Sequence, residues 1–316
     1  MPNPRTSAPR RQTPSTAAAG ATGSSGSGGW GARAGVLAAS GIAVLVVLAG
    51  IVIIATRSGD DPRPAGTATA KAAHVHGLGI DPQDGALYAG THYGLFRLAE
   101  GVAATRVADR VQDFMGFTVV GSSHYLASGH PGEGQGGPSS LGLIESTDGG
   151  RTWQSLSLAG RADFHALEAR HGRVYGLNSL TGEFLVSQDR QTWDTRSTIP
   201  MVDFAVSPDD PDVLLATTEQ GLARSDDGGR TFQPVPSAPL LQLVSWAEDG
   251  TIVGAAPDGT LHASTDDGRT WQRRGSLGAA PHALIATSGS EVFAAVDGAI
   301  LASADGGRTF DVRHRE

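Results

Sequence analysis

Short apolar runs alternate with turn residues over residues 71–316. Four of these runs follow one another closely: Phe164–Ala169, Arg173–Asn178, Glu183–Ser187 and Thr192–Arg196. Each is five or six residues long and rich in β-branched, aromatic or alternating polar and apolar residues, and turn-forming residues separate the runs. Four such strands make one small antiparallel sheet. The pattern therefore predicts an all-β domain that is built from several sheets of this kind.

One apolar stretch is much longer than the others. Residues 35–56 read GVLAASGIAVLVVLAGIVIIAT and contain no charged side chain. As a helix rising ~1.5 Å per residue, this stretch would span about 33 Å, enough to cross a bilayer core. A cleaved signal peptide is the alternative, but its apolar region usually has only ~7–15 residues. We therefore expect residues 35–56 to be a single transmembrane helix that anchors the protein in a lipid bilayer.

The segments on either side of this stretch predict its orientation. Residues 1–34 are rich in Pro, Ser, Thr, Ala and Gly and carry four arginines and no acid, so we expect a disordered, basic tail. Residues 57–70 have the composition of a linker. Because positive charge favours the cytoplasmic side of a membrane, the tail is expected in the cytoplasm and the domain at 71–316 outside it.

An eight-residue pattern, which we call the box, returns at a nearly constant interval. The copies are STDGGRTW at Ser146–Trp153, SDDGGRTF at Ser225–Phe232, STDDGRTW at Ser264–Trp271, SADGGRTF at Ser303–Phe310 and a shortened SQDRQTW at Ser187–Trp193. Successive copies start 38–41 residues apart. A fixed period near 40 residues is typical of an architecture made from repeated structural units.

Each position of the box suits a tight turn between two strands. The aspartate carboxylate can accept hydrogen bonds from backbone N–H groups of the turn, and glycine adopts a positive φ without steric cost. The aromatic residue that follows can pack between neighbouring sheets. We therefore expect the box aspartates to be structural and not catalytic. They are Asp148, Asp189, Asp227, Asp266 and Asp305.

The box resembles the Asp-box, or BNR repeat, of sialidases, sortilin-type receptors and related β-propellers. In that superfamily the box is structural, so the resemblance implies a fold and no particular reaction. A first unit without a box is also present, because GTHYGLFRL at Gly90–Leu98 aligns with TEQGLARS at Thr218–Ser225. One longer interval contains a glycine-rich insertion at His130–Ser140. We therefore predict a six-bladed propeller with four-stranded blades, and we see no room for a seventh blade.

Composition narrows the classes of function. The 316 residues include no cysteine, which excludes disulfides, thiolate nucleophiles, cysteine-based zinc sites and a lipid anchor on cysteine. The net charge is −8, and the arginines of the tail make the rest of the chain more acidic still. Binding to a phosphate backbone needs a basic surface, so we expect no nucleic-acid partner.

Propeller topology predicts where a ligand would bind. The box lies between the third and fourth strands of a blade and marks one face. The start of each innermost strand and the loop between the second and third strands lie on the other face, where propeller ligands usually bind. The residues expected there are His76, His92, Tyr93, Met115, His130, His165 and His282.

Two interpretations of these histidines stay open. Neutral imidazole binds zinc, copper or nickel and exchanges protons near neutral pH. His76, His165 and His282 occupy equivalent places in three units, so they are the expected ligands of a copper or zinc ion. Copying of one ancestral histidine between repeats would produce the same pattern without a function. The imidazoles would then only pack, hydrogen-bonded, around the channel.

Sialidase chemistry has little support in the sequence. The resemblance implies three arginines, a tyrosine nucleophile with a glutamate partner, an acid–base aspartate and an Arg-Ile-Pro motif. That motif is absent, the box arginines lie on the wrong face, and only Tyr93 of the four tyrosines maps near the channel mouth. Other glycosidases use two carboxylates. The candidates for such a pair are Glu133, Asp113, Asp163, Glu183 and Asp203.

Several segments of the histidine face resemble bacterial membrane-anchored or secreted propellers that are described as glycosylhydrolase-like. These segments read HVHGLGIDP, GTHYGLF, DFMGFTVVG, SGHPG and DFHAL, and the resemblance covers most of residues 74–316. We therefore expect a membrane-anchored, extracytoplasmic propeller that binds a glycan or a metal ion on this face. The alternatives are a glycoside hydrolase of unknown substrate and a non-catalytic propeller for protein interaction or assembly.

Overall fold

The computed structural model describes residues 74–109 and 111–315, which belong to one compact unit. They form 24 strands in six antiparallel sheets of four strands each. Among these residues no helix is long and apolar enough to cross a membrane. The predicted tail at 1–34, transmembrane helix at 35–56 and linker at 57–70 lie outside the described residues.

Each sheet, or blade, takes four strands that are consecutive in the sequence. Blade 1 has β1 (Val75–Ile80), β2 (Leu87–Thr91), β3 (Gly94–Leu98) and β4 (Thr105–Arg106), and blade 2 has β5 (Asp113–Gly121), β6 (His124–His130), β7 (Leu143–Ser146) and β8 (Gln154–Ser157). Blade 3 has β9 (Phe164–Arg170), β10 (Arg173–Asn178), β11 (Glu183–Ser187) and β12 (Asp194–Thr198), and blade 4 has β13 (Met201–Val206), β14 (Leu214–Thr218), β15 (Gly221–Ser225) and β16 (Gln233–Pro234). Blade 5 has β17 (Leu243–Trp246), β18 (Ile252–Ala255), β19 (Thr260–Ser264) and β20 (Gln272–Ser276), and blade 6 has β21 (Ala283–Ala286), β22 (Val292–Val296), β23 (Ala299–Ser303) and β24 (Asp311–Arg315).

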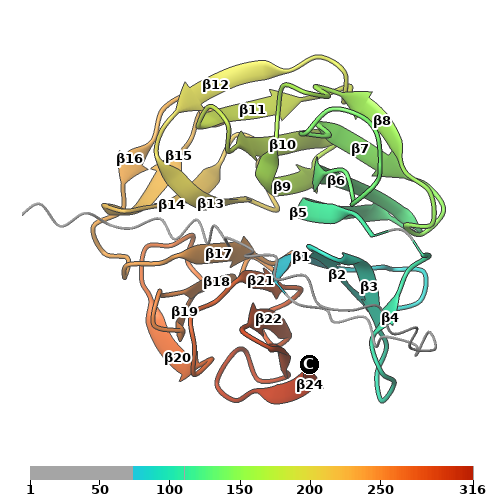
Figure 1. Cartoon of the computed structure of the whole chain (residues 1–316). Helices are drawn as coiled ribbons and strands as arrows, with labels where there is room; N and C mark the ends of the chain where they lie inside the picture. Colours follow the sequence, from blue (N-terminus) through green and yellow to red (C-terminus); the bar gives the residue numbers. More distant parts are fainter. Residues whose placement is uncertain (1–73, 110, 316) are drawn as a thin grey trace, which may run out of the picture. The chain divides into compact units, whose positions relative to one another are not determined.

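The blades close into a ring around a central channel. The innermost strands β1, β5, β9, β13, β17 and β21 contact one another in this order, and β21 contacts β1. Figure 1 shows the ring, in which the chain colour passes from cyan through green and yellow to red until blade 6 lies beside blade 1. The predicted six-bladed propeller is therefore confirmed. Each blade keeps its own fourth strand, so closure of the described ring needs no exchanged strand.

The strands predicted for blade 3 agree closely with those observed. β10 and β11 have the predicted bounds, and β9 is one residue longer. β12 begins at Asp194, two residues later than predicted. The reason is that Thr192 still belongs to the turn, where its N–H and hydroxyl both donate to the carboxylate of Asp189.

The hydrophobic core consists of six clusters, and each cluster fills the space between two adjacent blades. The cluster that closes the ring joins Val75 and Phe96 of blade 1 to Phe293 and Ile300 of blade 6. Burial of each such side chain stabilises the fold by about 1.5–3 kcal/mol. Because this last cluster is present, neither blade 1 nor blade 6 has an uncovered apolar face.

The box forms the turn between the third and fourth strands of its blade. In blade 2, Oδ1 of Asp148 accepts hydrogen bonds from the N–H of Thr152 and the hydroxyl of Ser146, both at 2.9 Å. Burial alone would raise the pKa of the Asp148 carboxyl, but the bonds from Thr152 and Ser146 lower it to about 2. The same bonds recur at Asp227, Asp266, Asp305 and, in the shortened box, Asp189.

The box also packs against the preceding blade. The ring of Phe232 in the blade 4 box lies 6.3 Å from the ring of Phe184 in blade 3. In the blade 2 box, Gly150 has a φ of 84°, and a Cβ at this position would lie 2.3 Å from Cδ2 of Leu95 in blade 1. Only glycine satisfies both the backbone angle and the close approach. The box therefore shapes the turn and also fits one blade onto the next.

Candidate functional site

The channel contains a cavity of about 830 Å³ that is lined by residues of all six innermost strands. From the residues that line the cavity near the starts of these strands, we take one polar or sulfur-containing residue per blade and call this set the channel ring. Its members are His76, Met115, His165, Asp203, Gln242 and His282. The box turns follow the third strands and therefore lie at the other end of the blades. The channel ring is thus the mouth of the cavity on the predicted histidine face.

In blade 1, two histidines of this face contact each other. His76 is the second residue of β1, and His92 lies in the turn between β2 and β3. Their Nε2 atoms are 3.1 Å apart, and Nδ1 of His92 donates to Oδ1 of Asp113 at 2.7 Å. Burial, with the charge of His92 beside it, lowers the pKa of His76 to about 4, whereas the hydrogen bond to Asp113 raises the pKa of His92. At neutral pH His76 is therefore a neutral imidazole.

In blades 2 and 3, two more histidines share one buried carboxylate. Nε2 of His165 lies 2.8 Å and Nε2 of His130 lies 3.5 Å from Oδ2 of Asp163, which also accepts the hydroxyl of Ser179 at 3.1 Å. Burial would raise the pKa of Asp163, but the hydrogen bond and charge of His165, and then the charge of His130, hold it below its usual value. The second oxygen of this carboxylate, Oδ1, is buried and has no hydrogen-bond partner.

The two groups form one arc at the mouth. Asp113 of the first group and His130 of the second are direct partners in the pairing of β5 with β6. At the other end of the arc, the ring of His74 lies 5.4 Å from that of His92 and 6.4 Å from that of His282. The histidine arc is the set His74, His76, His92, His130, His165 and His282. It covers blades 6, 1, 2 and 3.

The structure does not bring together the three histidines that we expected to bind one metal ion. Nε2 of His76 contacts His92, Nε2 of His165 contacts Asp163, and Nε2 of His282 contacts Asp297 at 3.2 Å. The three imidazoles therefore point to different partners, although all three line the cavity. Within residues 74–109 and 111–315, no group of three or more His, Asp or Glu side chains is arranged to hold a metal ion.

The other expected residues of this face take different positions. Met115 belongs to the channel ring, and Tyr93 is exposed in the turn beside His92. His130 is the last residue of β6 instead of a loop residue, and its Nδ1 donates to the carbonyl of Ser139 at 2.8 Å. Ser139 belongs to the glycine-rich insertion, so the insertion orients the His130 ring.

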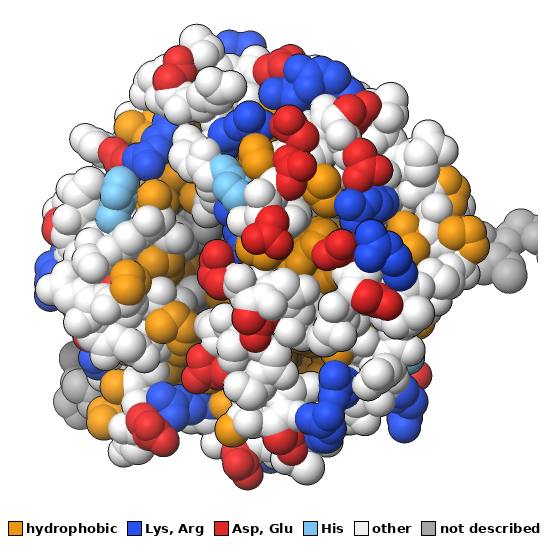
Figure 2. Space-filling view, turned by 180° about the vertical axis from the view of Figure 1, so that it is seen from behind, with side chains coloured by type: hydrophobic (Ala, Val, Ile, Leu, Met, Phe, Trp, Pro, Cys, Tyr) orange, Lys and Arg blue, Asp and Glu red, His pale blue; other side chains and the backbone are white. Residues whose placement is uncertain are grey.

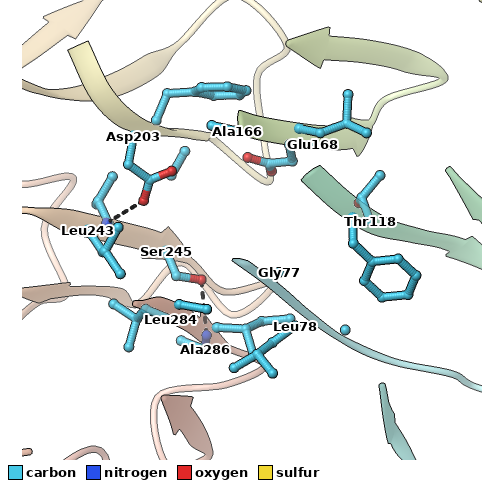
Figure 3. Close-up of a pocket in the computed structure, with 18 of the residues that line it drawn as sticks. Gly77, Leu78, Thr118, Ala166, Glu168, Asp203, Leu243, Ser245, Leu284 and Ala286 are labelled. Carbon is cyan, nitrogen blue, oxygen red and sulfur yellow. Dashed lines mark hydrogen bonds between the residues drawn. The ribbon is translucent and has the colours of Figure 1, made fainter. Parts of the chain in front are cut away.

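Two carboxyl groups that line the cavity lie apart from the imidazole pairs, and only Asp203 was among the candidates from the sequence. Figure 3 shows Asp203 of β13 and Glu168 of β9 with their carboxyl groups pointing toward the same part of the cavity. Each retains some solvent contact there and is otherwise surrounded by protein. Burial raises the pKa of both carboxyls to about 7; for Glu168 the charge of Arg170 opposes this effect, and the charge of Asp203 adds to it. Both therefore exchange protons near neutral pH.

The remaining candidate carboxylates have other roles. Asp113 and Asp163 hold imidazoles, as described above, and Glu183 accepts the hydroxyl of Thr181 in the turn between β10 and β11. Glu133 lies in the insertion after β6. Of the tyrosines, Tyr88, Tyr125 and Tyr175 are buried among the blades. None of these three is available as the nucleophile of a sialidase.

Exposed apolar side chains gather at the histidine end of the blades. Seven large hydrophobic residues are exposed in the described part of the chain. Five of them precede an innermost strand, are the second residue of one, or lie between the second and third strands of a blade. They are Tyr93, Val111, Leu180, Val202 and Leu240, from blades 1 to 5, and we call them the apolar rim. Val102 and Val312 lie elsewhere, in the turn after β3 and on the outer strand β24.

Charged side chains are mixed on the surface. On the face seen in Figure 2, acidic side chains gather around the hollow middle of the propeller, and basic side chains are interspersed among them.

Comparisons with known proteins agree on the fold. No protein-family model and no curated protein matches the chain. The structure of YCF48 bound to D1 peptide matches with a TM-score of 0.50 at 18% identity, over 77% of this chain and 82% of that chain. A gluconolactonase from Xanthomonas campestris matches with a TM-score of 0.59 at 12% identity, over 75% and 87%. A GH74 xyloglucanase from the same organism matches with a TM-score of 0.52 at 17% identity, over 77% of this chain but only 45% of that enzyme.

These comparisons show that the chain shares the propeller fold with these proteins. At such identities a shared propeller says nothing about a shared activity, because the same fold supports unrelated functions. The function has to be argued from the histidine arc, the apolar rim and the channel of this chain.

Proposed function

We propose that the protein is a binding propeller whose histidine face binds a polypeptide segment of a partner protein. The observation that carries the proposal is the position of the apolar rim: five of the seven exposed large hydrophobic residues lie at the same end of the blades as the histidine arc. Exposed large hydrophobic side chains that lie along one end of a domain are candidate contacts for a partner. Imidazoles and carboxylates beside them supply the polar contacts that fix a bound chain in one orientation.

A polypeptide fits the apolar rim better than a glycan does. Sugar rings pack on exposed aromatic faces, and Tyr93 is the only aromatic member of the rim. Leu180, Val202 and Leu240 are aliphatic and about half exposed, at 50–55%. Such side chains pack favourably against the apolar side chains of a peptide, which gain by leaving water. The structure of YCF48 bound to D1 peptide gives a precedent for peptide binding by this fold, in that protein.

Peptide selection tests the proposal. A phage-displayed random peptide library is panned against the full-length protein, and the enriched peptides are measured by titration calorimetry. We expect them to bind wild type and Val102→Asp, a control at the other end of the blades, with equal affinity. The triple variant Leu180→Asp, Val202→Asp and Leu240→Asp should bind at least about tenfold more weakly, since each buried aliphatic side chain contributes more than ~1 kcal/mol.

Two results would overturn polypeptide binding. One is a library from which no peptide is enriched. The other is binding that the triple variant retains in full while its melting curve stays cooperative. In parallel, a panel of soluble polysaccharides is titrated into the same protein. Saturable binding of a polysaccharide that the rim substitutions abolish would replace the polypeptide with a glycan as the ligand.

We further propose that residues 35–56 anchor this propeller in the cytoplasmic membrane and that the propeller lies on the outer side. The support is the uncharged sequence of that stretch and the four arginines that precede it without an acid. Reporter fusions to the C-terminus test the orientation. Activity of a periplasmic or surface reporter is expected, and activity of a cytoplasmic reporter alone would contradict it.

Glycoside hydrolysis is the second candidate function, and one observation favours it. Glu168 and Asp203 face the same cavity, and both exchange protons near neutral pH. An acid and a base of this kind flank the bond that a glycosidase cleaves. Under this alternative, the protein should hydrolyse an oligosaccharide, and Glu168→Gln and Asp203→Asn should each abolish the reaction. If no substrate in a panel of α- and β-linked oligosaccharides is hydrolysed, glycoside hydrolysis is excluded as the function.

A further inference from the structure

A second ligand is indicated by three histidines of blade 1. His74 and His76 lie at the start of β1, and His92 lies in the turn between β2 and β3. The Nε2 atoms of His76 and His92 are 3.1 Å apart, and their ring planes are nearly perpendicular at 77°. The ring of His74 lies 5.4 Å from that of His92. One short stretch of strand and one turn thus gather three imidazoles.

The spacing of the two Nε2 atoms suits a shared metal ion. Two imidazole nitrogens at 2.0–2.1 Å from a tetrahedral zinc ion are about 3.3 Å apart, close to the separation observed here. The alternative is a hydrogen bond, in which one of the two rings carries the proton between them. The hydrogen bond needs a proton on one of the two nitrogens, whereas a metal site needs both lone pairs to converge on the ion, which replaces that proton.

The surroundings of His92 also match those of a metal ligand. A metal-binding histidine usually donates its other ring N–H to a carboxylate, which fixes the tautomer and the ring orientation. Nδ1 of His92 donates to Oδ1 of Asp113 at 2.7 Å, so Nε2 is left to face His76. Asp113 is on β5 of the neighbouring blade, and this arrangement is therefore built by the contact of two blades and not by the turn alone.

The third donor needs a small movement. Within the described residues, no three such side chains are already arranged around one metal position. The side chain of His74 is exposed and its ring lies 5.4 Å from that of His92, so His74 is the candidate for the third donor once its side chain turns toward the pair. His76 lines the cavity, so an ion held by this residue would lie beside the channel mouth.

We propose that His74, His76 and His92 bind one divalent transition-metal ion, with Asp113 as the positioning residue for His92. Imidazole donors select zinc, copper or nickel over magnesium or calcium, which prefer oxygen ligands. The set differs from the expected triad of His76, His165 and His282, because only His76 belongs to both. The inference goes beyond polypeptide binding and is independent of it.

The test uses the full-length protein after removal of metal with a chelator. Zinc chloride and copper(II) sulfate are titrated separately by calorimetry, and the copper complex is examined by electron paramagnetic resonance. We expect one ion per chain, with hyperfine splitting from nitrogen ligands for copper. His92→Ala and His76→Ala should lose this stoichiometric binding, and His74→Ala should weaken it. Asp113→Asn should keep the stoichiometry and weaken the affinity by about 10–100-fold.

Matched controls separate this site from the rest of the face. His165→Ala removes a histidine of the same arc that is outside the proposed set, and His262→Ala removes one from β19. Both should bind metal as wild type does. Absence of stoichiometric binding by folded wild-type protein would overturn the proposal, and so would binding that His92→Ala leaves unchanged. His92 is in a turn, and a cooperative melting curve of its variant confirms that the fold is intact.

Discussion

The backbone N–H of Val206 donates a hydrogen bond of 3.0 Å to Oε2 of Glu168 and so links β13 to β9 inside the channel. An innermost strand has no strand on its channel side, and its N–H groups there need other acceptors. The same kind of link recurs at three more junctions between blades. In each of them a side-chain oxygen accepts a hydrogen bond from a backbone N–H of the next blade. The side chain of Thr118 accepts from Ala169 at 3.4 Å, that of Asp203 from Val244 at 2.9 Å and that of Ser245 from Ala286 at 3.0 Å.

A hydroxyl group is sufficient for this link, because Thr118 and Ser245 provide one at two of the four junctions. Glu168 and Asp203 use carboxyl groups instead, and these are difficult to ionise because of their burial. The link alone does not require ionisable groups. The two carboxyls therefore add a dependence on pH that the hydroxyl links do not have.

Glu168→Ala is predicted to destabilise the protein, whereas Glu168→Gln is not. Alanine leaves the buried N–H of Val206 without an acceptor, which costs about 1–3 kcal/mol of unfolding free energy. Glutamine keeps an oxygen at that place and carries no charge. Urea unfolding at pH 7.5 measures both. Equal stability of the alanine variant and wild type would show that water replaces the side-chain acceptor and that the link is not stabilising.

Asp203→Asn is predicted to change how stability depends on pH. The folded-state pKa of Asp203 is raised to about 7, above the ordinary aspartate value of about 3.9 in the unfolded chain. Between these values the folded state holds a proton that the unfolded state has lost, so its contribution to stability is lost as pH rises toward and through 7. The asparagine side chain does not ionise, so the variant does not lose this stability as the pH rises. At pH 8.5 it should exceed wild type by about 1–3 kcal/mol in unfolding free energy.

The difference between this variant and wild type should shrink as the pH falls to 5. Urea unfolding at pH 5, 6.5 and 8.5 provides the measurement, and the box aspartates stay ionised over this range because their pKa values are lowered. Glu168→Gln at the same three pH values serves as a companion, since the two carboxyls share the cavity. A difference that is constant with pH would contradict the raised pKa of Asp203.

Most of the fold was predictable from the sequence because the residues that specify each turn are close together in the chain and recur in every blade from blade 2 onward. The box at Ser225–Phe232 and its copies mark the turn after every third strand from blade 2 onward, and the constant step fixes the number of blades. Blade 1 was found without a box, from the alignment of Gly90–Leu98. The boundary of β12 was missed because Thr192, although part of the shortened box, was taken as the first residue of the strand, whereas its N–H and hydroxyl bond to Asp189 and keep it in the turn.

The site was only partly predictable, because its contacts are made between blades. Repeat spacing placed His76, His165 and His282 at equivalent positions, and all three line the cavity. Spacing does not show the direction of a side chain, and so it did not reveal that each ring faces a different partner. Glu168 was also missed. The available signal was a charged residue within an innermost strand, where polar side chains can only face the channel or a neighbouring blade.

Asp266→Ala is predicted to weaken folding without changing ligand binding. The carboxylate of Asp266 accepts bonds from the hydroxyl of Ser264 and from the N–H and hydroxyl of Thr270, all within one turn. Without them the box of blade 5 loses its internal acceptor, and the melting temperature should fall by several degrees. Asp311→Ala, which removes an exposed carboxylate from β24, is the control and should leave the melting temperature unchanged. Lost binding at an unchanged melting temperature would instead give Asp266 a functional role.

Gly150→Ala is predicted to destabilise the protein more than Gly149→Ala, although both glycines have a positive φ, 84° and 74°. Each substitution strains the backbone by about 1 kcal/mol. Only at position 150 does the new Cβ also collide with the preceding blade, 2.3 Å from Cδ2 of Leu95, whereas at position 149 the nearest atom is 3.5 Å away. Overpacking adds about 1–3 kcal/mol, so the difference in unfolding free energy measures how tightly the box fits blade 1. Equal losses in urea unfolding would mean that the box acts on its own turn alone. The additional variant Leu95→Ala removes the colliding atoms, and in that background the two glycine substitutions should cost the same.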